Sequence, residues 1–148
     1  MKFLNRLLSA LEGYIRSKTK TKSLYKMEPS EPIARFIVQK GDFIVTQNVA
    51  RPRAFLPNTS LETSVFRIFK LTSSEIWNIG ETYVSGPRNR TLYGRADIIN
   101  KDVEILGLSV IPDNVPDRHA NIVGWPKEKD KQISLAQELA AVATLKLK

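Results

Sequence analysis

The first seventeen residues of the chain carry apolar side chains at helical spacing. This pattern predicts an amphipathic helix over 1–17 with basic and acidic side chains on its other face. The segment is too short and too charged to span a bilayer. Its stripe fits packing on its own domain, on a second copy of the chain, on a protein partner or on a membrane surface. The residues expected to contact a partner are Leu4, Leu7, Leu8, Leu11 and Ile15.

A basic segment with prolines follows at 18–32. Lys18, Lys20 and Lys22 alternate with Thr and Ser, and two prolines then disfavour both helix and strand. The pattern predicts a linker. Its lysines are expected either to remain solvated as a tether or to contact the phosphates of a nucleic acid.

Short β-rich stretches begin the compact domain, which is expected to span 33–148. The stretches 33–39 and 42–47 predict a hairpin or a bent strand around Gly41. The stretch SVFRIFKL at 64–71 has apolar residues on both faces, which predicts a central strand.

A helix is expected after this strand, because Thr72 and Glu75 form a capping-box pattern. Gly80 is the expected stop. A last helix is expected to begin at Pro126 and to continue to the end of the chain. Its predicted apolar stripe consists of Ile133, Leu135, Leu139, Val142 and Leu145.

Between these helices, the stretches 92–99 and 103–113 predict a hairpin, with a bulge in its second strand at Gly107. A short strand is expected at 119–125. The resulting order predicts an α+β fold, with a mostly antiparallel sheet of about five to six strands. The C-terminal helix is expected to pack on one face of the sheet. The N-terminal amphipathic helix is expected as a separate element before the compact domain.

The charge is unevenly distributed. The chain of 148 residues has a formal net charge of +8. Residues 1–32 hold seven Lys and Arg against three Glu, whereas the remainder holds sixteen against twelve acidic residues. This balance favours polyanionic partners, such as nucleic acid or an acidic surface.

Several chemistries lack their motifs. The chain has no cysteine, which excludes disulfides and thiol catalysis, and its one histidine excludes a His-rich metal site. No phosphate-cradling or dinucleotide-binding glycine motif is present, and no cofactor is predicted. A Ser–His–Asp triad has no local signature here. The acidic residues 97, 102, 104, 113 and 117 are expected at turns and on the surface rather than as metal ligands.

His119 is the candidate general base, because imidazole is the side chain whose ordinary titration range lies closest to neutral pH. Asn121 lies two residues on and shares its strand face, which suits an orienting amide. Arg95 or Arg88 are the expected phosphate-holding partners. The alternatives are that His119 binds a ligand or that it has a structural role only.

Two loops concentrate arginines away from acidic residues. Arg51 and Arg53 lie in RPR, and Arg88 and Arg90 lie in PRNR. If the loops converge, their guanidinium groups suit phosphate, which makes these arginines candidate nucleic-acid contacts together with the three linker lysines. Sequence-specific RNA recognition is not indicated, because no aromatic signature of such a domain is present.

The stretch AFLPN…SVFRIFKLTSSEIWNIG…GRADI…GLSVIPDNVPDRHANIVGWPKEK…AQELA resembles short uncharacterised bacterial proteins found near mobile or defence-type genes. The resemblance covers roughly residues 50–145. It implies a bacterial, cytoplasmic accessory role, and it implies no activity and no site residue.

Two classes of function follow. The leading hypothesis is a non-enzymatic accessory subunit that binds a larger protein and, through its basic residues, nucleic acid. The second is a small phosphodiesterase, ribonuclease-like or toxin enzyme that uses His119 with arginines. Attachment to a membrane surface through 1–17 is a third alternative.

Overall fold

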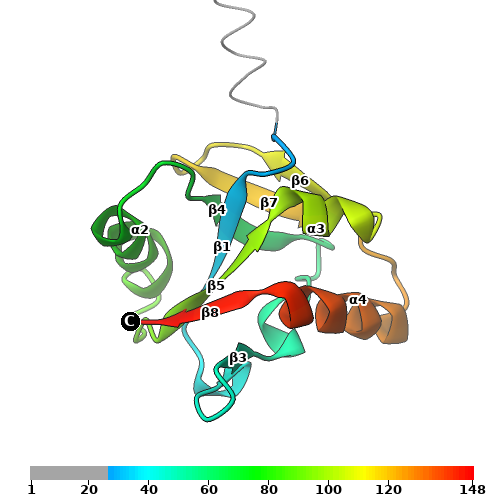
Figure 1. Ribbon diagram of the computed structural model, residues 1–148, viewed down its shortest axis with the longest axis horizontal. Coiled ribbons are helices and arrows are strands. Elements are labelled where there is room, and N and C mark those ends of the chain that lie inside the picture. The colour runs from blue at the N-terminus through cyan, green and yellow to red at the C-terminus, as the bar shows by residue number, and fades with distance from the viewer. Residues whose placement is uncertain (1–26) are drawn as a thin grey trace, which may run out of the picture.

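The computed structural model describes residues 27–148, and within them it contains a six-stranded sheet in the order β6-β7-β4-β1-β5-β8 (Figure 1). Every neighbouring pair of strands is antiparallel. The strands are β1 (Pro32–Ile37), β4 (Thr63–Arg67), β5 (Gly94–Ile99), β6 (Ser109–Pro112), β7 (His119–Val123) and β8 (Thr144–Leu147). The α+β class and the antiparallel sheet of about six strands are therefore confirmed.

The sheet separates two apolar cores, because successive side chains of a strand point to opposite faces. On β1, Ile33 and Ile37 lie in one core, and Ala34 and Phe36 lie in the other. The predicted central strand behaves in the same way. Its Val65 belongs to the first core and Phe66 to the second. The prediction of a strand buried on both faces is therefore confirmed.

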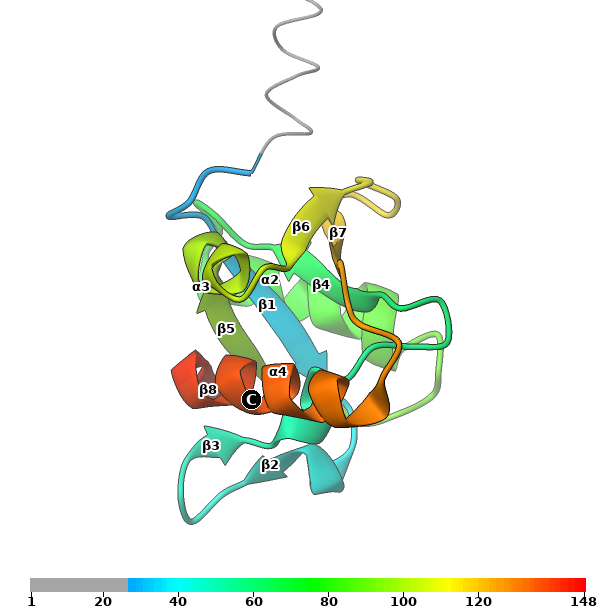
Figure 2. The ribbon, with the colours of Figure 1, turned by 90° about the vertical axis from the view of Figure 1, so that its right-hand side faces the viewer.

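The two helices α3 (Asn100–Ile105) and α4 (Lys129–Val142) cover the larger core, as Figure 2 shows, and a short 3₁₀ helix, η2 (Pro52–Ala54), joins them there. The helix α2 (Ser73–Gly80) covers the smaller core on the opposite face, where Ile76 packs with Phe36 and Phe66. The C-terminal helix therefore packs on one face as predicted, whereas the helices as a set cover both.

The predicted capping box of α2 is present, with the Thr72 hydroxyl accepting from the Glu75 N–H and the Glu75 side chain bound in return. The α-helix ends at Gly80 as predicted, but the glycine does not end the helical path of the chain. The chain continues directly into a π-helical turn, η3 (Glu81–Ser85), because Gly80 keeps a right-handed helical conformation.

The predicted hairpin of 92–99 with 103–113 is wrong, because residues 100–105 form α3. Its end is a Schellman motif: the N–H groups of Gly107 and Leu108 donate to the carbonyls of Glu104 and Val103. Gly107 has φ of +80°, which suits glycine at this position. The glycine assigned to a strand bulge therefore ends a helix.

The last helix differs from the prediction at both ends and in its buried face. It begins at Lys129 rather than Pro126, and residues 144–147 form β8, which pairs with β5. The side chains that α4 buries are Gln132, Ala136, Leu139 and Ala140. Ile133 and Val142 of the predicted stripe are 39% and 48% exposed, because the sheet meets the alanine-rich face instead.

The stretch 42–47 does not pair with β1. A 3₁₀ turn, η1 (Lys40–Asp42), redirects the chain, and β2 (Phe43–Ile44) pairs with β3 (Val49–Ala50) in a separate two-stranded ribbon. The bent-strand alternative is closer to this arrangement than the hairpin.

Packing begins before residue 33. Met27 is buried in the larger core, and Glu31 is buried against Arg67, with 2.5 Å between its Oε1 and the guanidinium Nε. The last residues of the predicted linker, 27–32, therefore belong to the domain. The predicted helix at 1–17 and the predicted linker residues 18–26 lie outside the described residues.

Candidate functional site

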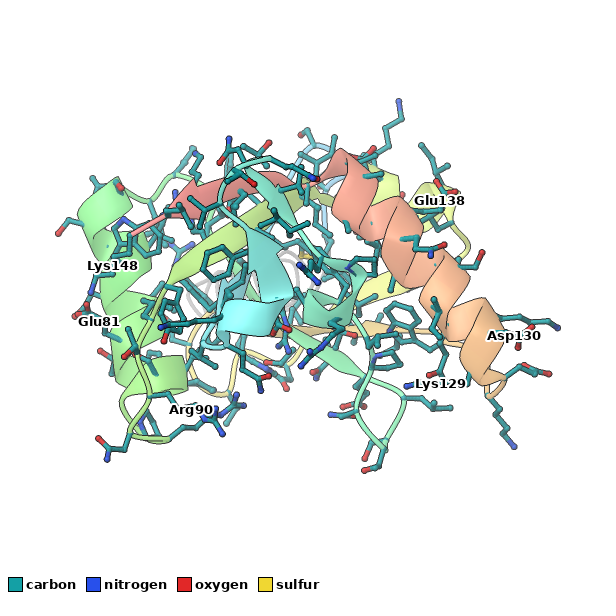
Figure 3. All side chains as sticks on the ribbon, turned by 90° about the horizontal axis from the view of Figure 1, so that it is seen from below. Glu81, Arg90, Lys129, Asp130, Glu138 and Lys148 are labelled. Atoms are coloured by element: carbon teal, nitrogen blue, oxygen red, sulfur yellow. The ribbon has the colours of Figure 1, made fainter. Side chains whose placement is uncertain are left out.

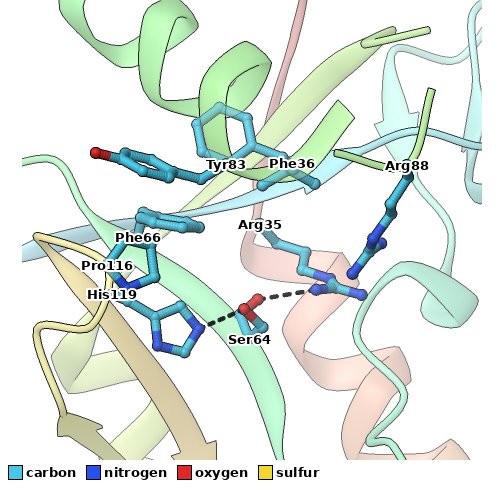
Figure 4. A pocket seen from close by; sticks show the side chains of 9 residues that line it. Arg35, Phe36, Ser64, Phe66, Tyr83, Arg88, Pro116 and His119 are labelled. Atoms are coloured by element: carbon cyan, nitrogen blue, oxygen red, sulfur yellow. Dashed lines mark hydrogen bonds between the residues drawn. The ribbon is translucent and has the colours of Figure 1, made fainter. Parts of the chain in front are cut away.

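Three side chains form a continuous hydrogen-bonded chain on the α2 face of the sheet. His119 Nε2 lies 2.6 Å from the Ser64 hydroxyl oxygen (Figure 4). Its Nδ1 lies 2.8 Å from a carboxylate oxygen of Asp113. Serine, imidazole and carboxylate in this order are the arrangement that activates a serine hydroxyl in many unrelated folds.

The register of three neighbouring strands produces this chain. His119 lies directly across from Phe66, and Ser64 lies across from Asn121, so Ser64 and His119 are diagonal neighbours on one face. On the other side, β6 pairs with β7 up to Pro112, and Asp113 follows at once. The triad therefore crosses β4, β7 and the end of β6.

Asp113 begins the loop between β6 and β7 and is held there by several donors. The Val115 N–H and His119 Nδ1 donate to the same carboxylate oxygen, and Asn121 donates to the other at 3.3 Å. Desolvation alone would raise the pKa of Asp113, but the hydrogen bonds from His119 and Val115 outweigh it, and the pKa lies below its ordinary value. Asp113 is therefore ionised at neutral pH.

The ionised Asp113 determines the tautomer of His119. A carboxylate only accepts hydrogen bonds, so the proton of the neutral imidazole lies on Nδ1. Nε2 is then free to accept from the Ser64 hydroxyl. This is the state in which an imidazole acts as a general base towards a serine.

Aromatic rings hold the imidazole in place. The Phe66 ring meets His119 edge to face, with 5.2 Å between ring centroids, and stacks on Tyr83 at 6.1 Å. Tyr83 comes from the π-helical turn η3. The departure from regular α-helix after Gly80 thus puts an aromatic ring over the site, a common use of π-helical turns.

Arg35 fills a gap between β1 and β4. The two strands pair only at Ile33–Arg67 and Ala34–Phe66. Beyond these pairs, Arg35 donates from Nη1 to the Ser64 carbonyl at 2.9 Å and from Nε to the Ala54 carbonyl at 2.7 Å. The guanidinium therefore replaces part of the sheet hydrogen bonding and fixes the backbone that carries the Ser64 hydroxyl.

A second guanidinium, that of Arg88, approaches Arg35 from the turn after η3 (Figure 4). Burial, followed by the charge of Arg88, lowers the pKa of Arg35, and Asp42 opposes that lowering. Arginine nevertheless keeps its charge at neutral pH. Two positive groups therefore lie beside each other at the site.

These groups surround a pocket of about 130 Å³. Within residues 27–148, the side chains lining it include no carboxylate, since Asp113 lies behind His119. They are Arg35, Phe36, Ser64, Phe66, Tyr83, Val84, Arg88, Pro116 and His119. The pocket thus combines a hydrogen-bonded serine, a positive side and an aromatic side.

Of the candidates named from the sequence, His119, Asn121 and Arg88 meet around this pocket or behind it. Arg95 does not. It is buried on β5, two strands from β4, where it bonds Asp97 and lies 4.5 Å above the Trp77 ring. Its role as a partner of His119 is therefore wrong, because the strand order separates them.

The other loop arginines do not reach the pocket. Arg53 is exposed and pairs with Asp42 and Gln39. Arg51 is exposed near the same ribbon, and Arg90 is exposed in the turn after η3 (Figure 3). Of these four arginines, only Arg88 lines the site.

The remaining candidates fall outside what the structure describes: Lys18, Lys20, Lys22, Leu4, Leu7, Leu8, Leu11 and Ile15. Among residues 27–148, no group of three or more His, Asp or Glu side chains is placed to hold a metal ion. No helix in the same range has the length and apolar character needed to cross a membrane.

Three residues of the site were missed from the sequence. The sequence predicts Asp113 at a turn, and its carboxylate does accept from the Val115 N–H, but the same oxygen also accepts from His119 Nδ1. Arg35 left a signal, since it is a lone charge inside the apolar run IARFIV. Ser64 left none, because a serine at the start of a strand is unremarkable until the neighbouring strand is known.

Comparisons with known proteins find no family model, no curated protein and no solved structure that matches the chain. The resemblance to short bacterial proteins near mobile or defence-type genes therefore stays a prediction.

Proposed function

We propose that this protein is a small hydrolase in which Ser64 is the nucleophile, His119 the general base and Asp113 the carboxylate that orients the imidazole. The observation that carries the proposal is the hydrogen-bonded chain from the Ser64 hydroxyl through His119 to Asp113, with 2.6 Å and 2.8 Å between its members. It belongs to the class of the phosphodiesterase or ribonuclease-like alternative, with a serine as the attacking group.

The roles follow from the geometry. His119 Nε2 takes the proton of the Ser64 hydroxyl as its oxygen attacks the substrate, and the Asp113 carboxylate stabilises the imidazolium that forms. The same imidazolium then gives its proton to the leaving group. Because one histidine acts in both directions, the lack of a second histidine is no obstacle to acid and base catalysis.

A fluorophosphonate probe tests the proposal without knowledge of the substrate, since it reacts with activated serines. Peptide mass spectrometry of the labelled protein is expected to place the adduct on Ser64. Labelling is expected to disappear in Ser64→Ala and to slow by about 10³-fold or more in His119→Ala. Ser60→Ala is the matched control, because Ser60 is exposed in a turn outside the pocket, and it is expected to label at the unchanged rate.

If the protein is instead a non-enzymatic accessory protein, as the leading hypothesis from the sequence has it, the probe is expected not to label Ser64 selectively. In that case the serine, imidazole and carboxylate would only stabilise the sheet face. Ser64 would then react no faster than exposed serines such as Ser60, and the hydrolase proposal would be abandoned. Binding of nucleic acid by Arg51, Arg53, Arg90 and the linker lysines is a separate proposal, tested by titration at low salt with and without residues 1–26.

A further inference from the structure

The positive side of the pocket is not required by serine chemistry as such. A neutral ester needs donors for one developing oxyanion, whereas this pocket has two guanidinium groups and no carboxylate among its lining residues within 27–148. Two like charges facing the same small space repel each other, and Asp42, whose charge also acts on Arg35, offsets this only from outside the lining of the pocket. The arrangement therefore indicates a ligand group with more than one charged oxygen.

The hydrogen bonds of Arg35 sharpen this reading. Its Nε and Nη1 donate to backbone carbonyls, and across the described residues no acceptor is found for Nη2. Arg88 is exposed, and its guanidinium lies at the pocket beside that of Arg35. Guanidinium groups match the oxygens of phosphate in both charge and planar donor geometry.

Such an anion would lie in the same pocket as the candidate nucleophile. Arg35 Nη1 lies 2.9 Å from the carbonyl oxygen of Ser64, the residue whose hydroxyl bonds His119. Ser64, Arg35 and Arg88 also line the same pocket of about 130 Å³, so an oxyanion held by Nη2 shares that small space with Ser64. The bound group is therefore the group that Ser64 attacks, rather than a remote anchor.

The size of the pocket limits what enters it. About 130 Å³ is well below the roughly 300–1,000 Å³ typical of sites that enclose a drug-sized ligand. A phosphoryl group fits, while the rest of the molecule lies outside. Tyr83, 43% exposed at the rim, offers an aromatic surface to that outer part.

We infer that the substrate is a phosphate ester, whose phosphoryl oxygens are held by Arg35 and Arg88 while Ser64 attacks the phosphorus. This inference rests on the proposed function and specifies its substrate class.

The reaction balances in two steps. In the first, the Ser64 oxygen forms a bond to phosphorus, the bond from phosphorus to the alcohol oxygen breaks, and the Ser64 proton passes through His119 Nε2 to the leaving alcohol. In the second, His119 takes a proton from water, whose oxygen attacks phosphorus as the bond to Ser64 breaks, and the proton returns to Ser64. The products are the alcohol and the phosphate, and no further reactant is needed.

Calorimetric titration of the full chain with inorganic phosphate tests the arginine site separately from catalysis. Arg88→Ala is expected to weaken binding at least 10-fold. The matched control is Arg90→Ala, because Arg90 is exposed in the same turn but does not line the pocket. Ser64→Ala is expected to bind phosphate as the unchanged protein does, because its hydroxyl is the nucleophile and not the anion holder.

Turnover of p-nitrophenyl phosphate, bis(p-nitrophenyl) phosphate and p-nitrophenyl acetate completes the test. Hydrolysis of at least one phosphate ester, with kcat/KM reduced in Arg88→Ala but not in Arg90→Ala, supports the inference. No phosphate binding at millimolar concentration, equal behaviour of the two arginine variants, or hydrolysis of the acetate alone overturns it. Phosphate binding that depends on Arg88, without labelling of Ser64, overturns the proposed hydrolase and leaves an anion-binding site.

Discussion

Ser64 and His119 are separated by 55 residues in the chain, yet the Ser64 hydroxyl oxygen and His119 Nε2 are 2.6 Å apart. They meet because β4 and β7 are neighbours in the sheet and their register puts both side chains on the α2 face. The candidate nucleophile and its base thus lie on two paired strands rather than on loops, which favours a fixed geometry.

Replacing Asp113 tests whether this geometry depends on the tautomer of His119. In Asp113→Ala, the acceptor that holds the imidazole proton on Nδ1 is lost, so the proton can move to Nε2 and remove the acceptor for the Ser64 hydroxyl. We expect fluorophosphonate labelling to slow by about 10³–10⁴-fold. Asn121→Ala is the control, because Asn121 bonds only the other oxygen of Asp113, at 3.3 Å, and a change below about 10-fold is expected. Equal losses in both variants would contradict the role given to Asp113.

The pH dependence of stability follows from the lowered pKa of Asp113. A carboxyl group whose pKa is lower in the folded than in the unfolded protein stabilises the fold at pH values above its unfolded pKa, here 3.8. That contribution is lost as the pH falls through the pKa of the folded state. Because Asp113 is half exposed, solvent weakens its interactions. We therefore expect the free energy of unfolding at pH 7 to be higher in the unchanged protein than in Asp113→Asn by less than about 1 kcal/mol. Urea unfolding at a series of pH values should show the two curves converging well below pH 3.8. A difference that persists unchanged into strong acid would show that the carboxylate is not its cause.

The buried face of α4 is tested by a pair of truncations. Leu139 is fully buried, so Leu139→Ala is expected to lower the free energy of unfolding by about 3 kcal/mol. Ile133 is 39% exposed on the same helix, and Ile133→Ala is expected to cost less than about 1 kcal/mol. Denaturant titrations measure both. A larger loss in Ile133→Ala than in Leu139→Ala would show that α4 buries the face that includes Ile133, as the apolar pattern of the sequence predicts.

The helix end at Gly107 gives a prediction about the backbone alone. A Cβ built there has no atom within 4 Å, so any cost of substitution comes from φ of +80° and not from crowding. Gly107→Ala is expected to lower stability by about 1–2 kcal/mol. Gly107→Asn is expected to lose less, because asparagine tolerates this conformation better. Thermal unfolding ranks the three proteins, and an alanine variant as stable as the glycine would argue against the Schellman motif.

Much of the local structure could be read from the chain. The α+β class, the antiparallel sheet, the capping box from Thr72 to Glu75 and the strand buried on both faces all depend on patterns within a few residues. The errors have the same local origin. Val103 and Ile105 favour strands by propensity, but tertiary packing of Val103 in the core and the glycine at 107 stabilise a helix there.

The end of the chain shows the same limit. The run Leu139, Val142, Leu145 continues a helical spacing past the point where α4 stops, and no glycine or proline marks that stop. The open edge of β5 offers backbone partners to residues 144–147, and pairing there replaces the last helical turn. The residues around 144–147 do not indicate that a strand edge is free, because that edge is formed by β5, which lies far away in the chain.

The candidate site divides in the same way. The sequence by itself singled out His119, Asn121 and Arg88, because residue type and period-two spacing are properties of the chain alone. Only the tertiary structure brought in Ser64, Asp113 and Arg35 and set Arg95 aside. Strand order and register fix which side chains meet across a sheet, and both depend on contacts between residues far apart in the chain. The sequence therefore determined that a polar pair stands on one face of a strand, and the fold decided that this pair lies between a serine, a carboxylate and two arginines.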